Sequence, residues 1–321
     1  MPKDLSASAA RAVTAGAPGS VATNGRDGAA ASTMAAGPGR STVMILGAIV
    51  SVQLGAALAA TMFDTVGSSG MVLLRLGFAA IVLLSISRPR LAGRTRHDWT
   101  VTVVFGVLLA TMNLTFYAAL DRLPLGLAVT LELLGPLGLA LAMSRRVSDL
   151  AWTALAIVGV VMLGESGNHI DAVGVVFALI AAVCWAGYIL LNAETGRRSS
   201  GIDGLALAIA VGAIVAAPIG IASGGTTLLR PTILLAGAGV AMLSSVINFC
   251  LELAALRTVA ARPFGVLMSL SPVAATLAGF VVLGQRLGVL QIVAIGCVIT
   301  ASVGTIYANA APSAGKRAAG S

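Results

Sequence analysis

The stretch YAALDRLPLGLAVTLELLGP, residues 117–136, decides the fold, because a weaker copy of it, LAALRTVAARPFGVLMSLSP, occupies residues 253–272. Six positions of the first copy recur unchanged at an offset of 136 residues: Ala118, Ala119, Leu120, Leu131, Leu134 and Pro136. The alternative is a chance match in a chain rich in alanine and leucine. A true duplication predicts two halves of similar structure, so the apolar segments on either side of each copy have to be counted.

The composition indicates a membrane protein. The chain has 321 residues, of which 58% are hydrophobic and only 10% are charged, and its mean hydropathy is +0.98. Soluble domains carry about 25% charged residues, so a soluble class is excluded. The three cysteines, Cys184, Cys250 and Cys297, lie in apolar segments without paired spacing, which predicts neither a disulfide nor a zinc site.

Ten apolar segments are long enough, or nearly so, to cross a bilayer as helices of about 20 residues. They are residues 42–62, 68–87, 99–120, 124–143, 150–164, 171–191, 202–222, 232–256, 263–283 and 288–308. We therefore predict an all-α polytopic membrane protein with two five-helix repeats, 42–164 and 171–308. Because five is odd, the second repeat is inverted in the membrane, an arrangement found in secondary transporters with a site near the repeat interface.

The basic residues orient the chain. With both termini in the cytoplasm, 16 of the 20 Lys and Arg residues fall on the cytoplasmic side, as the positive-inside rule requires. The same bias accounts for the net charge of +8 without a nucleic-acid partner. Residues 1–41 and 309–321 are rich in Ala, Gly and Ser and lack bulky apolar residues, so we expect a disordered cytoplasmic tail before the first span and a short one after the last.

Polar residues inside the spans of the first half mark a candidate site. At 1.5 Å per residue, Arg75, Glu132, Asn113 and Gln53 come from four different spans and share a layer about 10–14 Å from the outer side. Tyr117 lies one turn after Asn113. Ionisable groups in hydrocarbon are costly and usually face a bundle interior or a wet cavity. The alternatives are a buried Arg75–Glu132 ion pair that fixes packing, and amides that only hydrogen-bond between helices.

The second half has a corresponding layer nearer the inner side. Asn248 and Glu252 lie about 12 and 6 Å from the inner end of the eighth span, and Trp185 and Tyr188 lie about 9 and 5 Å from the inner end of the sixth. The alternatives are a surface pair of Glu252 with Arg257, an interhelical amide contact of Asn248, and interfacial aromatic residues. All nine polar and aromatic residues of the two layers are predicted to contact substrate and are named here the candidate set.

Two further patterns concern helix packing. The small residues Gly47, Ser51, Gly55 and Ala59 recur every four positions and predict a close helix contact. Pro136 and Pro272 each remove one backbone hydrogen bond, so each predicts a kink that either opens a cavity or only serves packing.

Several stretches resemble the drug/metabolite transporter superfamily, in its EamA family, and more narrowly the Rht-type threonine/homoserine exporters. They are MNLTFYAALDRLPLGLAVTLELLGPLGLAL, SRR followed by VSDLAW, AVCWAGYIL, LELAALRTVAARPFGVLMSLSPVAA and VLGQRLGVLQIVAIG, spread over about residues 43–307. The resemblance implies ten helices in two inverted repeats, cytoplasmic termini, and efflux of small amino acids. The family usually has Gly-Glu after its ninth helix, where this chain has Gly284-Gln285, which removes a titratable group from that loop.

The predicted function is export of small amino acids across the cytoplasmic membrane by alternating access. Its energy comes from an ion gradient, with protons as the candidate ion, or from the substrate's own gradient. A nucleotide-binding loop of the form GxxxxGK[ST] is absent, and we expect neither a cofactor nor an enzyme activity. The expected partners are a small-molecule substrate and the lipid bilayer, and a homodimer is left open. The alternatives are efflux of another metabolite or a cationic drug, an intramembrane enzyme, and a receptor or assembly subunit that transports nothing.

Overall fold

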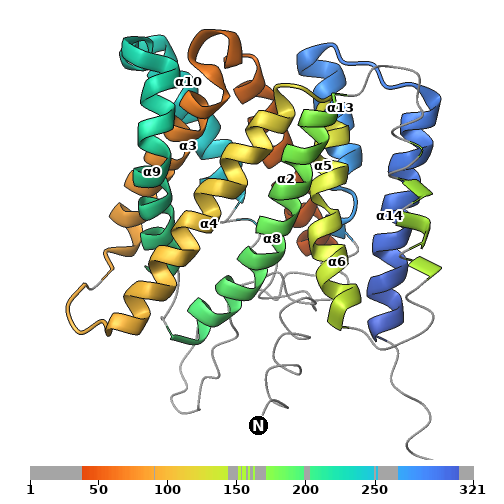
Figure 1. Ribbon diagram of the computed structural model, residues 1–321, viewed down its shortest axis with the longest axis horizontal. Helices are drawn as coiled ribbons and strands as arrows, with labels where there is room; N and C mark the ends of the chain where they lie inside the picture. The colour runs from red at the N-terminus through yellow and green to blue at the C-terminus, as the bar shows by residue number, and fades with distance from the viewer. Residues whose placement is uncertain are drawn as a thin grey trace, which may run out of the picture.

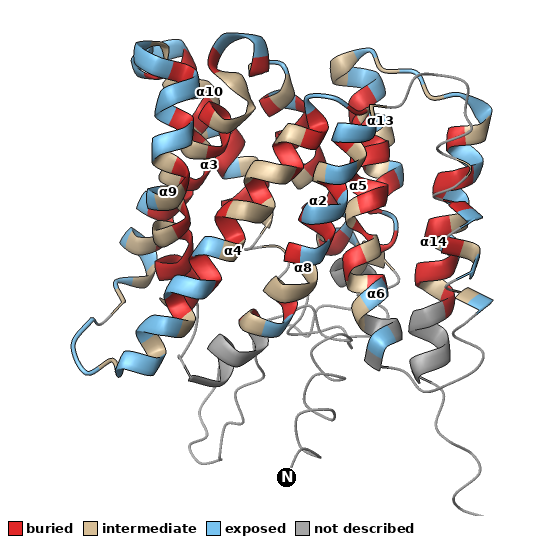
Figure 2. Ribbon diagram, in the orientation of Figure 1, coloured by how far each residue is buried: buried red, intermediate tan, exposed pale blue. Residues whose placement is uncertain are grey.

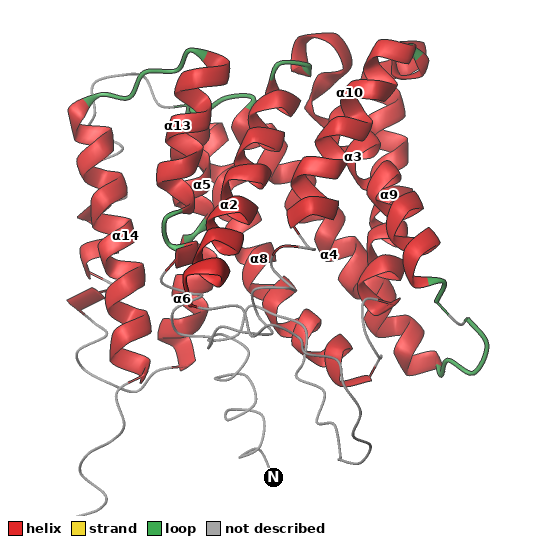
Figure 3. Ribbon diagram, turned by 180° about the vertical axis from the view of Figure 1, so that it is seen from behind, coloured by secondary structure: helices red, strands yellow, loops and turns green. Residues whose placement is uncertain are grey.

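The regular elements of the protein are helices throughout the part of the chain that the computed structural model describes (Figures 1 and 3). This part comprises residues 38–89, 91–143, 151–152, 154–156, 158–159, 162, 171–198, 203–248, 251 and 267–310. The predicted all-α class is therefore confirmed. Residues 1–37 and 311–321 of the two predicted tails lie outside the described residues, as do Cys250 and Glu252. Residues 38–41 and 309–310, predicted as tail, are helical instead.

The helices follow the predicted spans. They are α2 (Pro38–Ala60), α3 (Phe63–Ser87), α4 (Arg96–Leu120), α5 (Leu125–Glu132), α6 (Leu134–Met143), α8 (Ala172–Arg198), α9 (Asp203–Gly224), η1 (Gly225–Leu229), α10 (Pro231–Ala241), η2 (Met242–Ile247), α13 (Ser271–Leu283) and α14 (Val289–Ala310). The predicted fifth span is described only in part and is helical at those positions.

Five described helices are long and apolar enough to cross a membrane, and four shorter apolar helices accompany them. The helix α4 has 25 residues and so measures about 37 Å, more than the hydrocarbon core of a bilayer. The element α3 also has 25 residues, but it is kinked at Gly67, whose backbone angles are not helical. Large apolar side chains also lie on the outer surface: Val183, Leu235 and Val281 are 73%, 74% and 75% exposed. Figure 2 shows exposed and buried residues alternating along most helices. An apolar exterior of this kind suits lipid rather than water.

Local sequence sets the helix ends. Thr95 caps α4, since its hydroxyl accepts the N–H of Asp98 while the Asp98 carboxylate accepts the N–H of Thr95. Gly284 ends α13 in the left-handed region, with φ of 65°. Pro231 is the first residue of α10, where a missing N–H costs nothing.

The fourth predicted span is interrupted at Leu133, between α5 and α6. Pro136 explains the interruption, because proline has no N–H to give to the carbonyl of the residue four positions earlier, which is Glu132. The equivalent proline, Pro272, leaves the carbonyl of Met268 without its helical donor, and the hydroxyl of Ser271 donates to that carbonyl at 2.7 Å. The helix break thus lies directly beside the glutamate that the sequence analysis singled out.

The predicted small-residue contact on α2 is confirmed. The Ser51 hydroxyl donates to the carbonyl of Leu243 at 2.8 Å, and a Cβ added at Gly55 would collide with Ser244. Both partners belong to η2, where the helix widens to a π-type turn. Such turns are frequent at functional sites.

Contacts between distant helices bring the two predicted halves together. The helix α3 packs along α9, α4 packs on both α8 and α9, and α5 and α6 pack on α8. The helix α13 lies against α2 and α5, while α10 lies against α2 and α3. The core is therefore formed mainly between the halves and not within either of them.

One of these contacts gives a test of the packing. A Cβ at Gly135 would collide with the carbonyl of Ala182, whereas a Cβ at Gly138 on the same helix would meet nothing within 4 Å. We expect Gly135→Ala to destabilise the protein by about 1–3 kcal/mol, because the backbones of α6 and α8 must separate. Gly138→Ala is the matched control and should be neutral or slightly stabilising. Thermal unfolding in detergent measures both, and equal midpoints would contradict the close approach.

Candidate functional site

Arg75 on α3 is oriented by Tyr117 on α4. Its Nη1 donates a hydrogen bond to the Tyr117 hydroxyl at 3.2 Å, and the guanidinium carbon lies 5.5 Å from the centre of the tyrosine ring. The ring is 0% exposed and packs against Phe63 and Phe116, with ring centres 5.6 and 6.0 Å away. The arginine side chain is therefore fixed on one side by a buried aromatic cluster.

The other edge of the Arg75 guanidinium has no acceptor among the described residues. Nε is buried and has no hydrogen-bond partner, and Nη2 donates to no described residue either. Nε and Nη2 are the two parallel donors that a carboxylate accepts in a bidentate contact. Because an unpaired buried donor costs about 1–3 kcal/mol, this edge is suited to an anionic ligand.

Glu132, at the last position of α5, is the second ionisable group of the interior. It lies deep within the bundle, yet its side chain is partly accessible and not fully buried. Arg75 is close enough for its charge to act on the carboxylate. The two side chains do not form an ion pair: the ion pair found in the described part of the chain is Arg122–Asp171. A directly bonded, purely structural Arg75–Glu132 pair is thus not what the structure contains.

The three predicted amides differ in burial and hydrogen bonding. Gln53 on α2 and Asn113 on α4 are 6% and 5% exposed. The Asn113 amide nitrogen donates to the Leu109 carbonyl of its own helix at 2.8 Å, so this nitrogen does not link helices. Gln53 makes no hydrogen bond to any described residue. Asn248 follows η2, and its Oδ1 is buried without a partner.

The aromatic residues of the second half lie on α8. Tyr188 packs against Phe105 of α4, with ring centres 5.4 Å apart, and is half-buried, as is Trp185. The tyrosine therefore contacts a neighbouring helix of the other predicted half. The role of both residues in binding stays a prediction.

Comparison with known proteins identifies the family. A model of the EamA-like transporter family matches residues 172–307. The threonine/homoserine exporter RhtA of Escherichia coli strain K12 is 37% identical over 270 residues, which cover 82% of this chain and 90% of that exporter. RhtA of Salmonella typhimurium strain LT2 is 38% identical over the same shares.

The chain belongs to the EamA-like transporter family. The family predicted from the sequence is therefore confirmed, and these relatives are transporters and not enzymes. A solved crystal structure, 18% identical, aligns with a TM-score of 0.56 over 84% of this chain and 98% of its own. At that identity the likeness concerns the fold alone.

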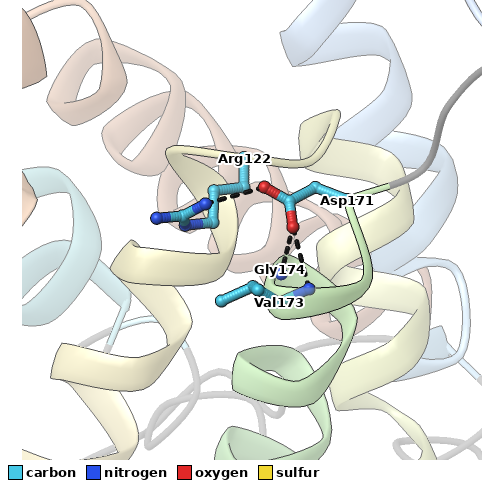
Figure 4. Close-up of polar contacts among 4 residues, drawn as sticks. All are labelled: Arg122, Asp171, Val173 and Gly174. Atoms are coloured by element: carbon cyan, nitrogen blue, oxygen red, sulfur yellow. Dashed lines mark hydrogen bonds and ion pairs between the residues drawn. The ribbon is translucent and has the colours of Figure 1, made fainter.

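A polar cluster that the sequence analysis missed lies where α4, α5 and α8 of this EamA-like transporter meet (Figure 4). Arg122 Nη1 donates to Asp171 Oδ2 at 2.7 Å. The other carboxylate oxygen, Oδ1, accepts the N–H groups of Val173 and Gly174 at 2.8 and 3.3 Å and so caps α8. The hydrogen bond from Arg122 holds the pKa of the Asp171 carboxyl below its ordinary value, and the two backbone hydrogen bonds act in the same direction.

The same α4–α5 turn is held from a second side. The backbone N–H of Leu125 donates to the Gln285 side-chain oxygen at 2.9 Å, and the Gln285 N–H donates to the Gly279 carbonyl at 3.1 Å. Gln285 is the residue at which this chain departs from the family's Gly-Glu pattern. The neutral amide supplies an acceptor to the start of α5 without a charge. The unusual Gln285 could be noticed in the sequence because the family has glutamate there. Its hydrogen bond with Leu125 could not be predicted, since the two residues are 160 positions apart.

Proposed function

We propose that this transporter exports small amino acids of the threonine and homoserine type from the cytoplasm across the cytoplasmic membrane. The observation that carries the proposal is the match to a threonine/homoserine exporter over 90% of that protein's length. The substrate class is inferred from the relatives, and the residues described above supply a chemical reason for it.

An amino acid is a zwitterion, and Arg75 and Glu132, the ionisable members of the candidate set that the structure describes, suit its two charges. The Nε–Nη2 edge of Arg75, which has no acceptor among the described residues, would donate two hydrogen bonds to the carboxylate. Glu132, which has no direct ion-pair partner among the described residues, would hold either the substrate ammonium or a coupled proton. The amides of Gln53, Asn113 and Asn248 would hydrogen-bond a short polar side chain such as that of threonine.

The proposed architecture is ten helices in two inverted repeats, 42–164 and 171–308. The support comes from the contacts between helices. If α2, α3, α4 and α5 are the counterparts of α8, α9, α10 and α13, exchanging each helix for its counterpart turns one observed contact into another. By this exchange the contact of α4 with α8 corresponds to that of α10 with α2, and α4 with α9 to α10 with α3. Likewise α2 with α13 corresponds to α8 with α5, while α3–α9 and α5–α13 map onto themselves. Such pairing is expected of a two-fold axis in the membrane plane.

The proposed orientation places both termini, residues 1–41 and 309–321, in the cytoplasm. Its support is the distribution of basic residues, with 16 of 20 on that side. Under this topology the Arg122–Asp171 cluster and Gln285 lie at the outer face. The helix break beside Glu132 would permit the two repeats to rock around the site, which is alternating access.

A second candidate is efflux of a cationic compound. The observation that favours it is a deep, partly accessible carboxylate at Glu132 without a direct cationic partner among the described residues. Its helix α5 packs on α8, which carries the aromatic residues Trp185 and Tyr188. A cationic drug would need Glu132 but not Arg75. The two functions therefore differ in whether the transported compound must carry a carboxylate group.

Purified protein in liposomes loaded with labelled threonine tests the proposal directly. We expect efflux above that of protein-free liposomes. This efflux should be saturable, and homoserine but not a lipophilic cation should compete with it. The reverse pattern of competition would favour the second candidate. The absence of flux for every amino acid and cation in the panel would refute both. Repeating the assay with an imposed pH gradient measures proton coupling.

A further inference from the structure

We propose that Tyr117 makes the binding site selective for carboxylates by positioning Arg75, and that it does not contact the substrate itself. The proposal rests on the function proposed above and refines the role of one residue of the candidate set. It starts from a plain mismatch: Tyr117 was predicted to touch substrate, but it is fully buried. A side chain without an accessible surface acts on a substrate only through its neighbours.

The neighbour of Tyr117 that can reach a substrate is Arg75. The hydroxyl of Tyr117 accepts a hydrogen bond from Arg75 Nη1 at 3.2 Å. The centre of the tyrosine ring lies 5.5 Å from the guanidinium carbon. Both contacts restrict rotation of a long side chain that otherwise has many conformations. The tyrosine in turn is held by the rings of Phe63 and Phe116, so its own position is fixed.

The nitrogens of the Arg75 guanidinium fall into two sets, one bound by the protein and one left for a ligand. Nη1 is used by the protein, while Nε and Nη2 have no acceptor among the described residues. Only the Nε–Nη2 edge then remains for a ligand, and its two parallel N–H bonds match the two oxygens of a carboxylate. An amide or an alcohol offers only one oxygen atom, so it cannot make two parallel hydrogen bonds to separate oxygens, and it carries no negative charge. Pre-orientation of this edge therefore favours amino acids over their carboxamides.

The test is the variant Tyr117→Phe, which keeps the ring and its packing and removes the hydroxyl. Efflux from proteoliposomes is measured against concentration for threonine and for threoninamide, which lacks the carboxylate. We expect the half-saturating concentration of threonine to rise about 10-fold, with little change in maximal rate, because one hydrogen bond to a charged group is lost. Threoninamide should be unaffected. The matched control is Thr115→Val, which removes a hydroxyl that donates within the same helix.

A second background makes the assignment specific to Arg75. In Arg75→Gln protein, adding Tyr117→Phe should change nothing further, since no guanidinium remains to be positioned. An equal loss for threonine and threoninamide, or an additive loss in the Arg75→Gln background, would overturn the proposal. Failure of the proposed function looks different, because the wild-type protein would then show no threonine flux at all.

Independently, we propose that residues 121–124, the α4–α5 turn, form a latch that must open for substrate to leave at this face. The turn is bound on two sides by the other predicted repeat: by α8 through Arg122–Asp171, and by the end of α13 through Gln285 and Leu125. The backbone also approaches α8 closely, since a Cβ at Gly174 would lie 2.9 Å from that of Arg122. Separation of the repeats here breaks all three contacts together.

A reversible cross-link tests the latch. Cysteines replace Arg122 and Asp171 in a background without Cys184, Cys250 and Cys297, and a reducible bifunctional thiol reagent joins them. We expect efflux to fall at least about 10-fold on cross-linking and to recover on reduction, because alternating access requires the two repeats to separate. The same protein treated with a monofunctional reagent should remain active. Full efflux from cross-linked protein would overturn the proposal, whereas a background without flux before cross-linking would instead count against the function.

Discussion

Replacing Arg75 with alanine is expected to raise the half-saturating concentration of threonine about 100-fold in the proteoliposome assay. Two charge-assisted hydrogen bonds would be lost, each worth about 1.5–3 kcal/mol. Lysine should give an intermediate loss, about 10-fold, because its ammonium keeps the charge but cannot present two parallel donors. The effect should be absent for threoninamide. A similar loss for both compounds would mean that Arg75 serves packing.

The matched control for Arg75 is Arg230, an exposed arginine that precedes α10. Its replacement with alanine removes a positive charge on the outer side of the proposed topology, without touching the interior. We expect unchanged efflux. If Arg75→Ala and Arg230→Ala behave alike, the carboxylate does not bind at Arg75.

The second large effect is expected for Glu132→Gln, which preserves shape and removes the negative charge. Efflux of threonine should fall at least about 10-fold, since a buried charge partner of the ammonium, or the proton carrier, is gone. The assay in the presence and absence of a pH gradient separates these roles. A carrier that exchanges a proton at Glu132 should lose its response to the gradient in this variant, whereas an ammonium site alone should keep it.

Asp64→Asn provides the comparison for the charge change, because Asp64 is an exposed carboxylate in the first turn of α3. It should export threonine as the wild type does. Wild-type efflux and an unchanged response to the gradient in Glu132→Gln protein would remove Glu132 from the mechanism altogether.

The helices could be predicted from the sequence because apolar runs bounded by polar and Gly/Pro clusters are a local signal. Pro136 predicted a kink, because a proline removes one hydrogen bond of the preceding helical turn and this effect is local. The structure places the interruption at Leu133. The beginning of α3 combines two segments: the element starts at Phe63, but Gly67 is non-helical, with φ of 73° and ψ of 158°. The continuous helix therefore begins at Ser68, where the span was predicted to begin, and the short turn around Asp64 precedes it.

The candidate site could be predicted where burying a single residue in an apolar segment costs an unusual amount of free energy. A charge among apolar residues identifies Arg75 and Glu132 without any knowledge of neighbours. Contacts between distant helices cannot be obtained in this way. Tyr117 and Arg75 are 42 positions apart, and nothing in either segment indicates that one orients the other. The same holds for Ser244, which meets Gly55 only because two helices cross there.

Asp171 illustrates how a geometry restricts the choice of amino acid. One carboxylate oxygen caps α8 and the other binds Arg122, so a replacement must supply two acceptors at that reach. Serine and threonine have one oxygen, asparagine would turn a donor group towards the guanidinium, and glutamate is a methylene longer. Random mutagenesis at this codon should therefore recover few alternatives to aspartate, whereas substitutions of Arg122 disturb the pair and leave the helix cap in place.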